Sequence, residues 1–198
     1  MPLNISCFVE DVGHRLVVGP LLRKICQEAG SSIQVRFLNA TGGKGKALDE
    51  LRQVKQDIAL GRLECPAVLV AAIDGNCEGY GIVKRRVEEI VGSELSVQLV
   101  CAVPDPHVER WLLLDSEAFK LAVGRGCAAP DNKCERDRYK GLLRRALFDA
   151  NLVPQLDGLE FAEAIVAEYN LERAASIDSS FSHFLSDVRA AVASVRSW

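Results

Sequence analysis

The sequence predicts an α/β protein whose parallel sheet of about four strands is flanked by helices and followed by an all-helical C-terminal portion. Short apolar runs rich in β-branched residues alternate with segments of helical periodicity through the first half of the chain. One run, Pro66 to Ile73, is almost wholly apolar. Such a run is typical of a central parallel strand that is covered on both faces. After residue 115, no segment has the pattern of a strand.

The predicted elements follow each other in the order β-α-β-α-β-α-β, which favours a doubly wound sheet with right-handed crossovers. We expect strands at 4–9, 33–38, 66–73 and 95–103, and helices at 12–29, 47–60 and 82–91. In the second half we expect helices at 107–115, 131–151, 158–170 and 179–195. Gly19-Pro20 is expected to kink the first helix or to mark its true start. In the last helix, Phe181, Phe184 and Leu185 belong to one apolar stripe.

Composition and length indicate one folded unit. The chain has 198 residues, of which 48% are hydrophobic and 26% charged, which is ordinary for a globular protein. We expect a single domain over 1–198, with an α/β core at 1–115 and a helical extension at 116–198 packed on it. The net charge of −3 argues against a broadly basic surface that coats nucleic acid. It does not exclude an enzyme that acts on nucleic acid through metal ions, which supply positive charge locally.

The cysteines and the N-terminus predict a cytoplasmic protein. The seven cysteines are odd in number and form no CxxC pair, so we expect reduced thiols. The N-terminal residues lack the charged region and long apolar run of a signal peptide. No apolar stretch approaches the roughly 18 residues that a membrane span needs, so we expect no membrane association.

Carboxylates follow three of the predicted strands. Glu10 and Asp11 follow the first strand, Asp74 follows the apolar run, and Glu109 comes shortly after the last strand. Ligands of open parallel sheets collect beyond the carboxyl ends of the strands, and clustered oxygen donors suit Mg²⁺ or Mn²⁺. The alternative is that these residues only keep loops soluble. His107, beside Glu109, is the best functional candidate among the histidines.

Basic residues form two further candidates. Thr41 to Lys46 reads TGGKGK, but neither Lys44 nor Lys46 has the spacing of a Walker phosphate loop. A glycine-rich turn before a helix can still present N–H groups and a lysine to phosphate, and a flexible turn with solvated lysines is an equal alternative. Lys140 lies in the most basic stretch, 133–145, which is either a nucleic-acid groove or the solvated face of a helix.

Several motifs resemble those of Toprim proteins. Phe8-Val9-Glu10-Asp11 and the later Ile73-Asp74-Gly75-Asn76 resemble the Toprim pattern of a strand-end glutamate followed by Asp-x-Asp. The segment 106–115, PHVERWLLLD, resembles the E-x-W-L-L-x-D stretch of small bacterial Toprim-like proteins. These are related to Toprim nucleases of the overcoming-lysogenization-defect type and often accompany ATPases in phage-defence loci. Segments 137–140 and 181–187 are also similar to that group, so the resemblance covers nearly the whole chain.

The resemblance implies a Toprim fold and a Mg²⁺- or Mn²⁺-dependent nuclease that cleaves DNA or RNA, with an ATPase partner in an antiviral defence assembly. The implied catalytic residues are Glu10, Asp74 and Glu109, and the implied metal ligands are Glu10, Asp74, Asn76 and Glu78. Lys44, Lys46 and Lys140 would approach phosphates, with His107 and Asp11 as further candidates. Asn76 departs from the pattern because it stands where the second aspartate is expected; Glu78 is a candidate to compensate.

Two alternatives follow from that departure. The chain can be a catalytically inactive Toprim-fold interaction or regulatory subunit of an ATPase complex. It can also be a regulator or toxin that binds its target without cutting it. The sequence leaves its oligomeric state open.

Overall fold

The fold is a four-stranded parallel sheet, as predicted, in a computed structural model that describes residues 2–41 and 43–196, without the side chains of 43–45 and 196. The strands are β1 (Leu3–Val9), β2 (Ile33–Asn39), β3 (Val68–Ala72) and β4 (Gln98–Ala102). Their order in the sheet is β2-β1-β3-β4. Cys7 lies opposite Val70, and Val70 lies opposite Val100, so the carboxyl ends of the three strands meet at one edge.

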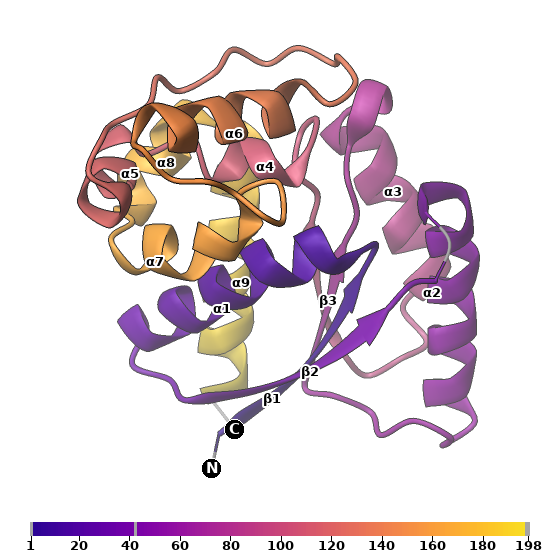
Figure 1. Cartoon of the computed structure of the whole chain (residues 1–198). Helices are drawn as coiled ribbons and strands as arrows, with labels where there is room; N and C mark the ends of the chain where they lie inside the picture. Colours follow the sequence, from indigo (N-terminus) through magenta and orange to yellow (C-terminus); the bar gives the residue numbers. More distant parts are fainter. Residues whose placement is uncertain (1, 42, 197–198) are drawn as a thin grey trace.

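Helices cover both faces of this sheet (Figure 1). Two of them, α2 (Gly43–Ala59) and α3 (Tyr80–Val91), lie on one face, and α1 (Val12–Glu28) and α9 (Ser179–Arg196) lie on the other. Side chains alternate along each strand: Cys7 and Val9 pack in the core beneath α1, while Phe8 packs in the core beneath α2 and α3. Both faces are therefore buried, which explains the continuous apolar run of β3.

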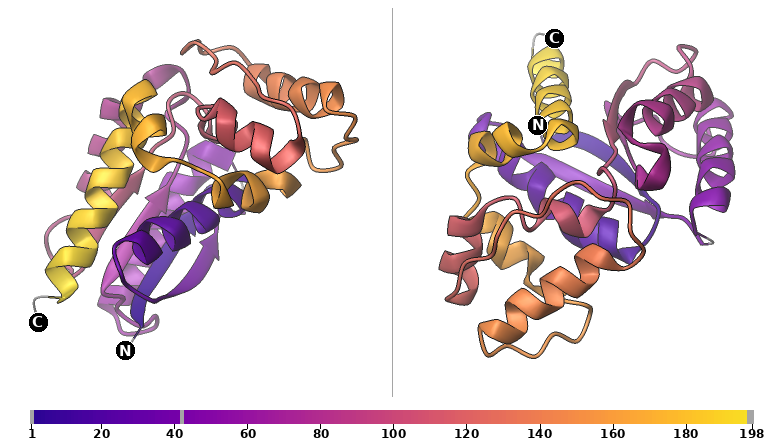
Figure 2. Two further views of the ribbon diagram at one scale, coloured as in Figure 1. Left: turned by 90° about the vertical axis from the view of Figure 1, so that its left-hand side faces the viewer. Right: turned by 90° about the horizontal axis from the view of Figure 1, so that it is seen from above.

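The C-terminal helices extend the core on the α1 side. They are α4 (Val108–Trp111), α5 (Ser116–Val123), α6 (Arg138–Asp149), α7 (Ala162–Ala167), α8 (Leu171–Ile177) and α9, with the short 3₁₀ turn η2 (Leu159–Phe161) before α7. Another 3₁₀ turn, η1 (Asn76–Glu78), lies between β3 and α3. Helix α9 packs on β4 and α1, and α7 packs on α1. In Figure 2, α9 runs alongside the sheet while α6 stands away from it.

Several predicted boundaries were wrong. Helix α2 begins at Gly43, so most of the expected 42–46 loop is its first turn; Gly42 lies outside the described residues. Helix α1 continues through Pro20. Helix α6 begins at Arg138, seven residues later than expected at 131, because the preceding segment has no regular structure. The expected 158–170 helix is a 3₁₀ turn followed by the short α7. Among the described residues, no helix is long and apolar enough to cross a membrane.

The expectation that all cysteines are reduced thiols was also wrong. Cys77 and Cys134 form a disulfide, with their Cα atoms 5.3 Å apart, and both residues are exposed. The two positions are 57 residues apart in sequence. They meet because the turn after β3 lies against the segment that precedes α6, a tertiary contact that cysteine spacing does not reveal.

Candidate functional site

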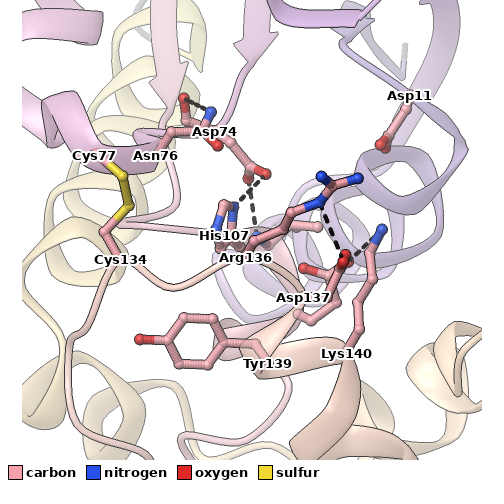
Figure 3. A pocket seen from close by; sticks show the side chains of 12 residues that line it. Asp11, Asp74, Asn76, Cys77, His107, Cys134, Arg136, Asp137, Tyr139 and Lys140 are labelled. Atoms are coloured by element: carbon pink, nitrogen blue, oxygen red, sulfur yellow. Dashed lines mark hydrogen bonds and ion pairs between the residues drawn. A yellow bond between two sulfur atoms is a disulfide. The ribbon is translucent and has the colours of Figure 1, made fainter.

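A cavity of about 310 Å³ opens at the carboxyl edge of β1, β3 and β4 (Figure 3). One wall comes from the residues that follow these strands, and the other comes from the start of α6 and the segment before it. The lining residues are Asp11, Asp74, Asn76, Cys77, His107, Val108, Glu109, Cys134, Arg136, Asp137, Tyr139 and Lys140. We call this cavity the edge pocket.

Asp74 is the centre of the site. Its Oδ1 accepts a hydrogen bond from the backbone N–H of Val108 (2.9 Å) and lies 3.0 Å from Nε2 of His14. Its Oδ2 lies 3.2 Å from Nδ1 of His107. The backbone N–H of Asp74 donates to Oε2 of Glu10 (3.1 Å). This one aspartate therefore connects the end of β1, the first helix and the turn after β4.

His14 is fully buried between two carboxylates. Its Nδ1 lies 2.9 Å from Oδ1 of Asp11, and its Nε2 faces Asp74. Burial alone would lower the pKa of His14, but the charges of Asp74 and Asp11 and their hydrogen bonds outweigh burial and raise that pKa well above its usual value. His14 is therefore an imidazolium that donates to both carboxylates. Asp11 also caps α1 by accepting the N–H of His14 (3.0 Å).

The histidines in turn keep Asp74 ionised. Burial would raise the pKa of Asp74, but the positive charge of His14 and the hydrogen bonds from His107 and His14 lower it. The same contact acts on His107, because its hydrogen bond to Asp74 raises the pKa of the imidazole. A continuous chain of charged contacts thus runs from Asp11 through His14 and Asp74 to His107.

Glu10 and Glu109 are the two carboxylates of the site whose pKa is raised. Burial is the largest cause for both, and the negative charge of Asp74 adds to it. Oε1 of Glu109 lies 3.8 Å from Nζ of Lys140, which partly offsets these effects. Asp74 therefore lies close enough to Glu10 and to Glu109 to repel both carboxylates.

Two loops lie directly against each other beneath the edge pocket. The N–H of Gly75 donates to the carbonyl of Pro104 (2.7 Å), and the N–H of Asn76 donates to the carbonyl of Pro106 (2.8 Å). A Cβ atom at position 75 would stand 3.0 Å from the Pro104 oxygen, so glycine allows this close approach. These bonds align the turn that carries His107 and Glu109 with Asp74. The peptide between Asp105 and Pro106 in this turn is cis.

Asn76 lines the edge pocket in a left-handed conformation, with φ of 48°. Its side-chain amide Nδ2 donates to the carbonyl oxygen of Asp74 (3.3 Å). Its Oδ1 is therefore the side-chain oxygen that could ligate a metal ion. Glu78, which the sequence suggested as a substitute for a second aspartate, forms an ion pair with Arg86 (2.5 Å) and does not line the pocket. That prediction was wrong because the 3₁₀ turn after Asn76 directs residue 78 toward α3.

Two cations stand at the opposite wall. Arg136 is 95% exposed and pairs with its neighbour Asp137 (3.4 Å), and Lys140 extends from the first turn of α6 toward Glu109. Lys133 and Arg138 of this stretch pair with Asp131, and Arg144 pairs with Asp157. Lys46 is exposed and does not line the pocket. The side chain of Lys44 lies outside the described residues.

Of the predicted set, the structure places Asp11, Asp74, Asn76, His107, Glu109 and Lys140 in the pocket lining. Glu10 accepts the backbone N–H of Asp74 but does not line the pocket. From the sequence alone, His14 is as likely to be exposed on the surface as to face the site from the first helix. An aspartate at a helix N-cap followed by a histidine three positions later is nevertheless a signal for the contact between Asp11 and His14. The sequence indicated no role in the site for Arg136, Asp137, Tyr139 or the two disulfide cysteines. These residues reach the pocket through the irregular segment before α6, whose path the sequence does not reveal.

Within the residues that the structure describes, no three His, Cys, Asp or Glu side chains form a ready-made metal-binding group. Comparisons with protein-family models, with curated proteins and with solved structures each found no match to this chain. The chemistry of the edge pocket is therefore the basis for assigning a function to this protein.

Proposed function

We propose that the edge pocket is the active site of a divalent-metal-dependent phosphodiesterase that acts on DNA or RNA. The observation that supports this most is the placement of Asp74 and Glu109 in the pocket opposite the cations Arg136 and Lys140, with Glu10 bound to the backbone N–H of Asp74. Carboxylates on one wall suit a metal ion, and cations on the other suit the oxygens of a phosphate. An ATPase partner in a defence assembly, which the Toprim resemblance implies, belongs to the same proposal.

The donor set fits magnesium or manganese in its chemistry. Burial and the negative charge of Asp74 raise the pKa of Glu10 and of Glu109, and a divalent cation would relieve that repulsion. Asp74 Oδ2 has one contact, to His107, whereas Oδ1 already accepts two hydrogen bonds. Glu10, Asp74 and Glu109 would hold the ion. When bound, it would supply a Lewis acid for the phosphate and a water of lowered pKa.

The chain's own side chains have separate tasks in this proposal. Lys140 and Arg136 bind the phosphate oxygens of the substrate and orient them toward the carboxylates. His14, protonated between Asp11 and Asp74, keeps Asp74 ionised and in place. His107 holds a proton on the nitrogen that faces Asp74.

The test is a cleavage assay on single- and double-stranded DNA and RNA with Mg²⁺ or Mn²⁺. We expect Asp74→Asn and Glu109→Gln each to lower the rate on the order of 100-fold, as removal of a group that stabilises the transition state does. Glu168→Gln, an exposed carboxylate outside the pocket, is the matched control. Circular dichroism of each variant separates loss of activity from loss of folding. If the wild type cleaves none of these substrates with either metal, or if both pocket variants retain full activity, the proposal is wrong.

A second candidate function, a catalytically inactive interaction or regulatory subunit, is favoured by the state of two residues. Asn76 has no charge, and its amide is bound to the Asp74 carbonyl, while His14 holds one oxygen of Asp74. Titration with Mn²⁺ separates the candidates. If the wild type fails to bind Mn²⁺ but Asn76→Asp binds it, the site has lost its metal and the second candidate holds. Asn132→Asp adds the same charge outside the pocket and should leave binding unchanged.

A further inference from the structure

We propose that the Cys77–Cys134 disulfide is a thiol–disulfide exchange site, opened by a dithiol reductant, and that it controls how the segment 124–137 is held at the edge pocket. We call this segment, which joins α5 to α6 without helix or strand, the connecting segment. The exchange site itself stands apart from the proposed phosphodiesterase. Its effect on a phosphate ligand rests on that proposed function.

The disulfide is open to attack from solvent. Both Cys77 and Cys134 are exposed, and they line the pocket mouth in Figure 3. The buried thiols are less reactive, because burial raises the pKa of Cys101 to about 12 and that of Cys26 to about 11. Cys65 is an exposed free thiol. Exposed disulfides are more readily reduced than buried structural ones, and in cytosolic proteins they are mostly transient or regulatory.

The bond joins the two walls of the edge pocket. Cys77 follows Asn76 on the wall formed by the strand ends, and Cys134 precedes Arg136 by two residues on the opposite wall. Other contacts hold the connecting segment further from the pocket mouth, at residues 130–133. Arg110 Nε donates to the Pro130 carbonyl (3.4 Å), and the Tyr139 hydroxyl lies 2.9 Å from the carbonyls of Asp131 and Lys133.

Residues 135–137 are held at the start of α6, where Glu135 pairs with Arg138 (3.0 Å) and the Asp137 carbonyl accepts the N–H of Gly141 (2.9 Å). The disulfide is the covalent link between this wall and the strand-end wall. Arg136 is the most exposed cation of the pocket, and its ion pair joins it to its own neighbour Asp137. When the sulfur–sulfur bond opens, the covalent link between the walls is lost. Arg136, two residues from Cys134, then loses its covalent tie to the strand-end wall.

The exchange needs only the dithiol. A thiolate of the reductant attacks one sulfur of the pair, forms a mixed disulfide and releases the other cysteine as a thiolate. The second thiol of the reductant, once deprotonated, attacks the mixed disulfide and releases the first cysteine. Two electrons and two protons pass to Cys77 and Cys134, and the reductant becomes a disulfide.

Limited trypsin digestion with and without dithiothreitol tests the exchange site. We expect reduction to speed cleavage after Lys133 and Arg136 at least about tenfold, since a segment that loses its tether opens locally. Cys134→Ser, digested without reductant, should reproduce the fast cleavage. Cys65→Ser removes the exposed free thiol and should leave the response to reductant unchanged. Equal cleavage of the oxidised and reduced forms would overturn the proposal, as would seven titratable thiols in protein exposed only to mild oxidant.

The consequence for the pocket is measured with a fluorescent single-stranded oligonucleotide. Reduction and Cys134→Ser should each weaken its binding several-fold, about the loss expected when one cation leaves a phosphate site. Faster cleavage of the protein by trypsin without weaker oligonucleotide binding would support the exchange site and disprove its control over the ligand. Redox-dependent trypsin cleavage in a protein that binds no oligonucleotide in either state would instead count against the proposed phosphodiesterase alone.

Discussion

The turn after β4 contributes to two networks of charged side chains that differ in their access to solvent. His107 and Glu109 face the edge pocket, where Asp74 and Lys140 meet them. Arg110, the next residue, points the other way and pairs with Asp178 at the start of α9. Those two side chains are 5% and 4% exposed, whereas Lys140 is 42% exposed. We call the contacts around Arg110 and Asp178 the sealed network. We call the contacts of Asp74 with His14 and His107, and of Glu109 with Lys140, the pocket network.

The sealed network is nearly saturated with hydrogen bonds. The Ser180 hydroxyl accepts from the N–H of Asp105 (3.2 Å) and from Trp111 Nε1 (3.1 Å), and it donates to Asp178 (2.5 Å). Arg110 also donates to the Asp105 carbonyl (3.3 Å). The charges of the sealed network are buried and cannot change partners. This network therefore fixes the turn after β4. The pocket network borders a cavity, so its charges can exchange partners with a ligand. Four predictions test this contrast.

The largest effect is expected for Arg110→Met. The substitution leaves the Asp178 carboxylate buried without its cation, which should cost about 3–5 kcal/mol of the free energy of unfolding. Denaturant titration followed by Trp fluorescence measures this loss. The matched control is Arg144→Met, which breaks the exposed ion pair with Asp157 and should cost about 0.5 kcal/mol. Equal effects of the two variants would show that the sealed network is not what holds the turn.

Ser180→Ala should have the next largest effect. It removes the acceptor of the Trp111 and Asp105 N–H groups, and each buried group left unpaired costs about 1–3 kcal/mol. The same denaturant titration measures the cost, and the Trp emission should shift because the indole N–H loses its partner. Ser194→Ala, which removes a hydroxyl from the same helix nearer its end, is the control. A loss below about 0.5 kcal/mol would mean that other groups satisfy these donors.

The pocket network should make stability depend on pH above neutrality. The pKa of His14 is raised in the folded protein, so its contribution is complete below the unfolded-state pKa of about 6.5 and is lost as the pH rises through the folded pKa. The free energy of unfolding should fall over that window by up to about 1.4 kcal/mol per pH unit. His14→Gln should reduce this slope, and the slope that remains includes the contribution of His107, whose pKa is also raised by its hydrogen bond to Asp74.

His183→Gln, which changes an exposed histidine stacked on Tyr80, should keep the wild-type slope. Unfolding curves at several values between pH 6 and 9 provide the comparison. A His14→Gln variant with the full wild-type slope would show that the pocket network does not carry the proton.

The smallest effect on stability is expected for Lys140→Ala. The side chain is partly exposed and 3.8 Å from Glu109, so its loss should change the free energy of unfolding by about 0.5 kcal/mol or less. Binding of a phosphate ligand in the edge pocket should weaken nonetheless. Thermal unfolding and oligonucleotide titration on the same preparation measure both quantities. A loss of more than about 1.5 kcal/mol would place Lys140 in the structural class with Arg110.

The sheet could be predicted from the sequence because each strand is a short apolar run between polar turns. The structure confirms the α/β class, with four parallel strands close to the expected ranges. Helices α5 and α8 were not predicted, because helices of seven or eight residues depend on tertiary packing more than on their own periodicity. The start of α6 was misplaced for a related reason, since the charged residues 131–137 suit a helix but form the connecting segment.

The candidate site was predictable only where the strand-end rule applies. Glu10, Asp74 and Glu109 follow directly or closely on parallel strands, so the topology alone places them together. His14 and Ser180 reach buried partners through helix packing, which one sequence does not specify. Arg136 and Cys134 reach the pocket along an irregular path. The Toprim assignment, the metal and the nucleic-acid substrate remain predictions that the experiments above test.

The positions of the first strand and the last helix at the two ends of the described chain have a practical consequence. Pro2 and Asn4 lie beside Val192 and Val195 of α9 and line a shared hollow, at the amino edge of the sheet and opposite the edge pocket (Figure 1). A chain attached at either end would therefore extend away from the carboxylates. Immobilising the protein through one terminus on a sensor surface should leave the pocket facing the solution, so ligand binding and redox response can be measured on the same tethered molecules.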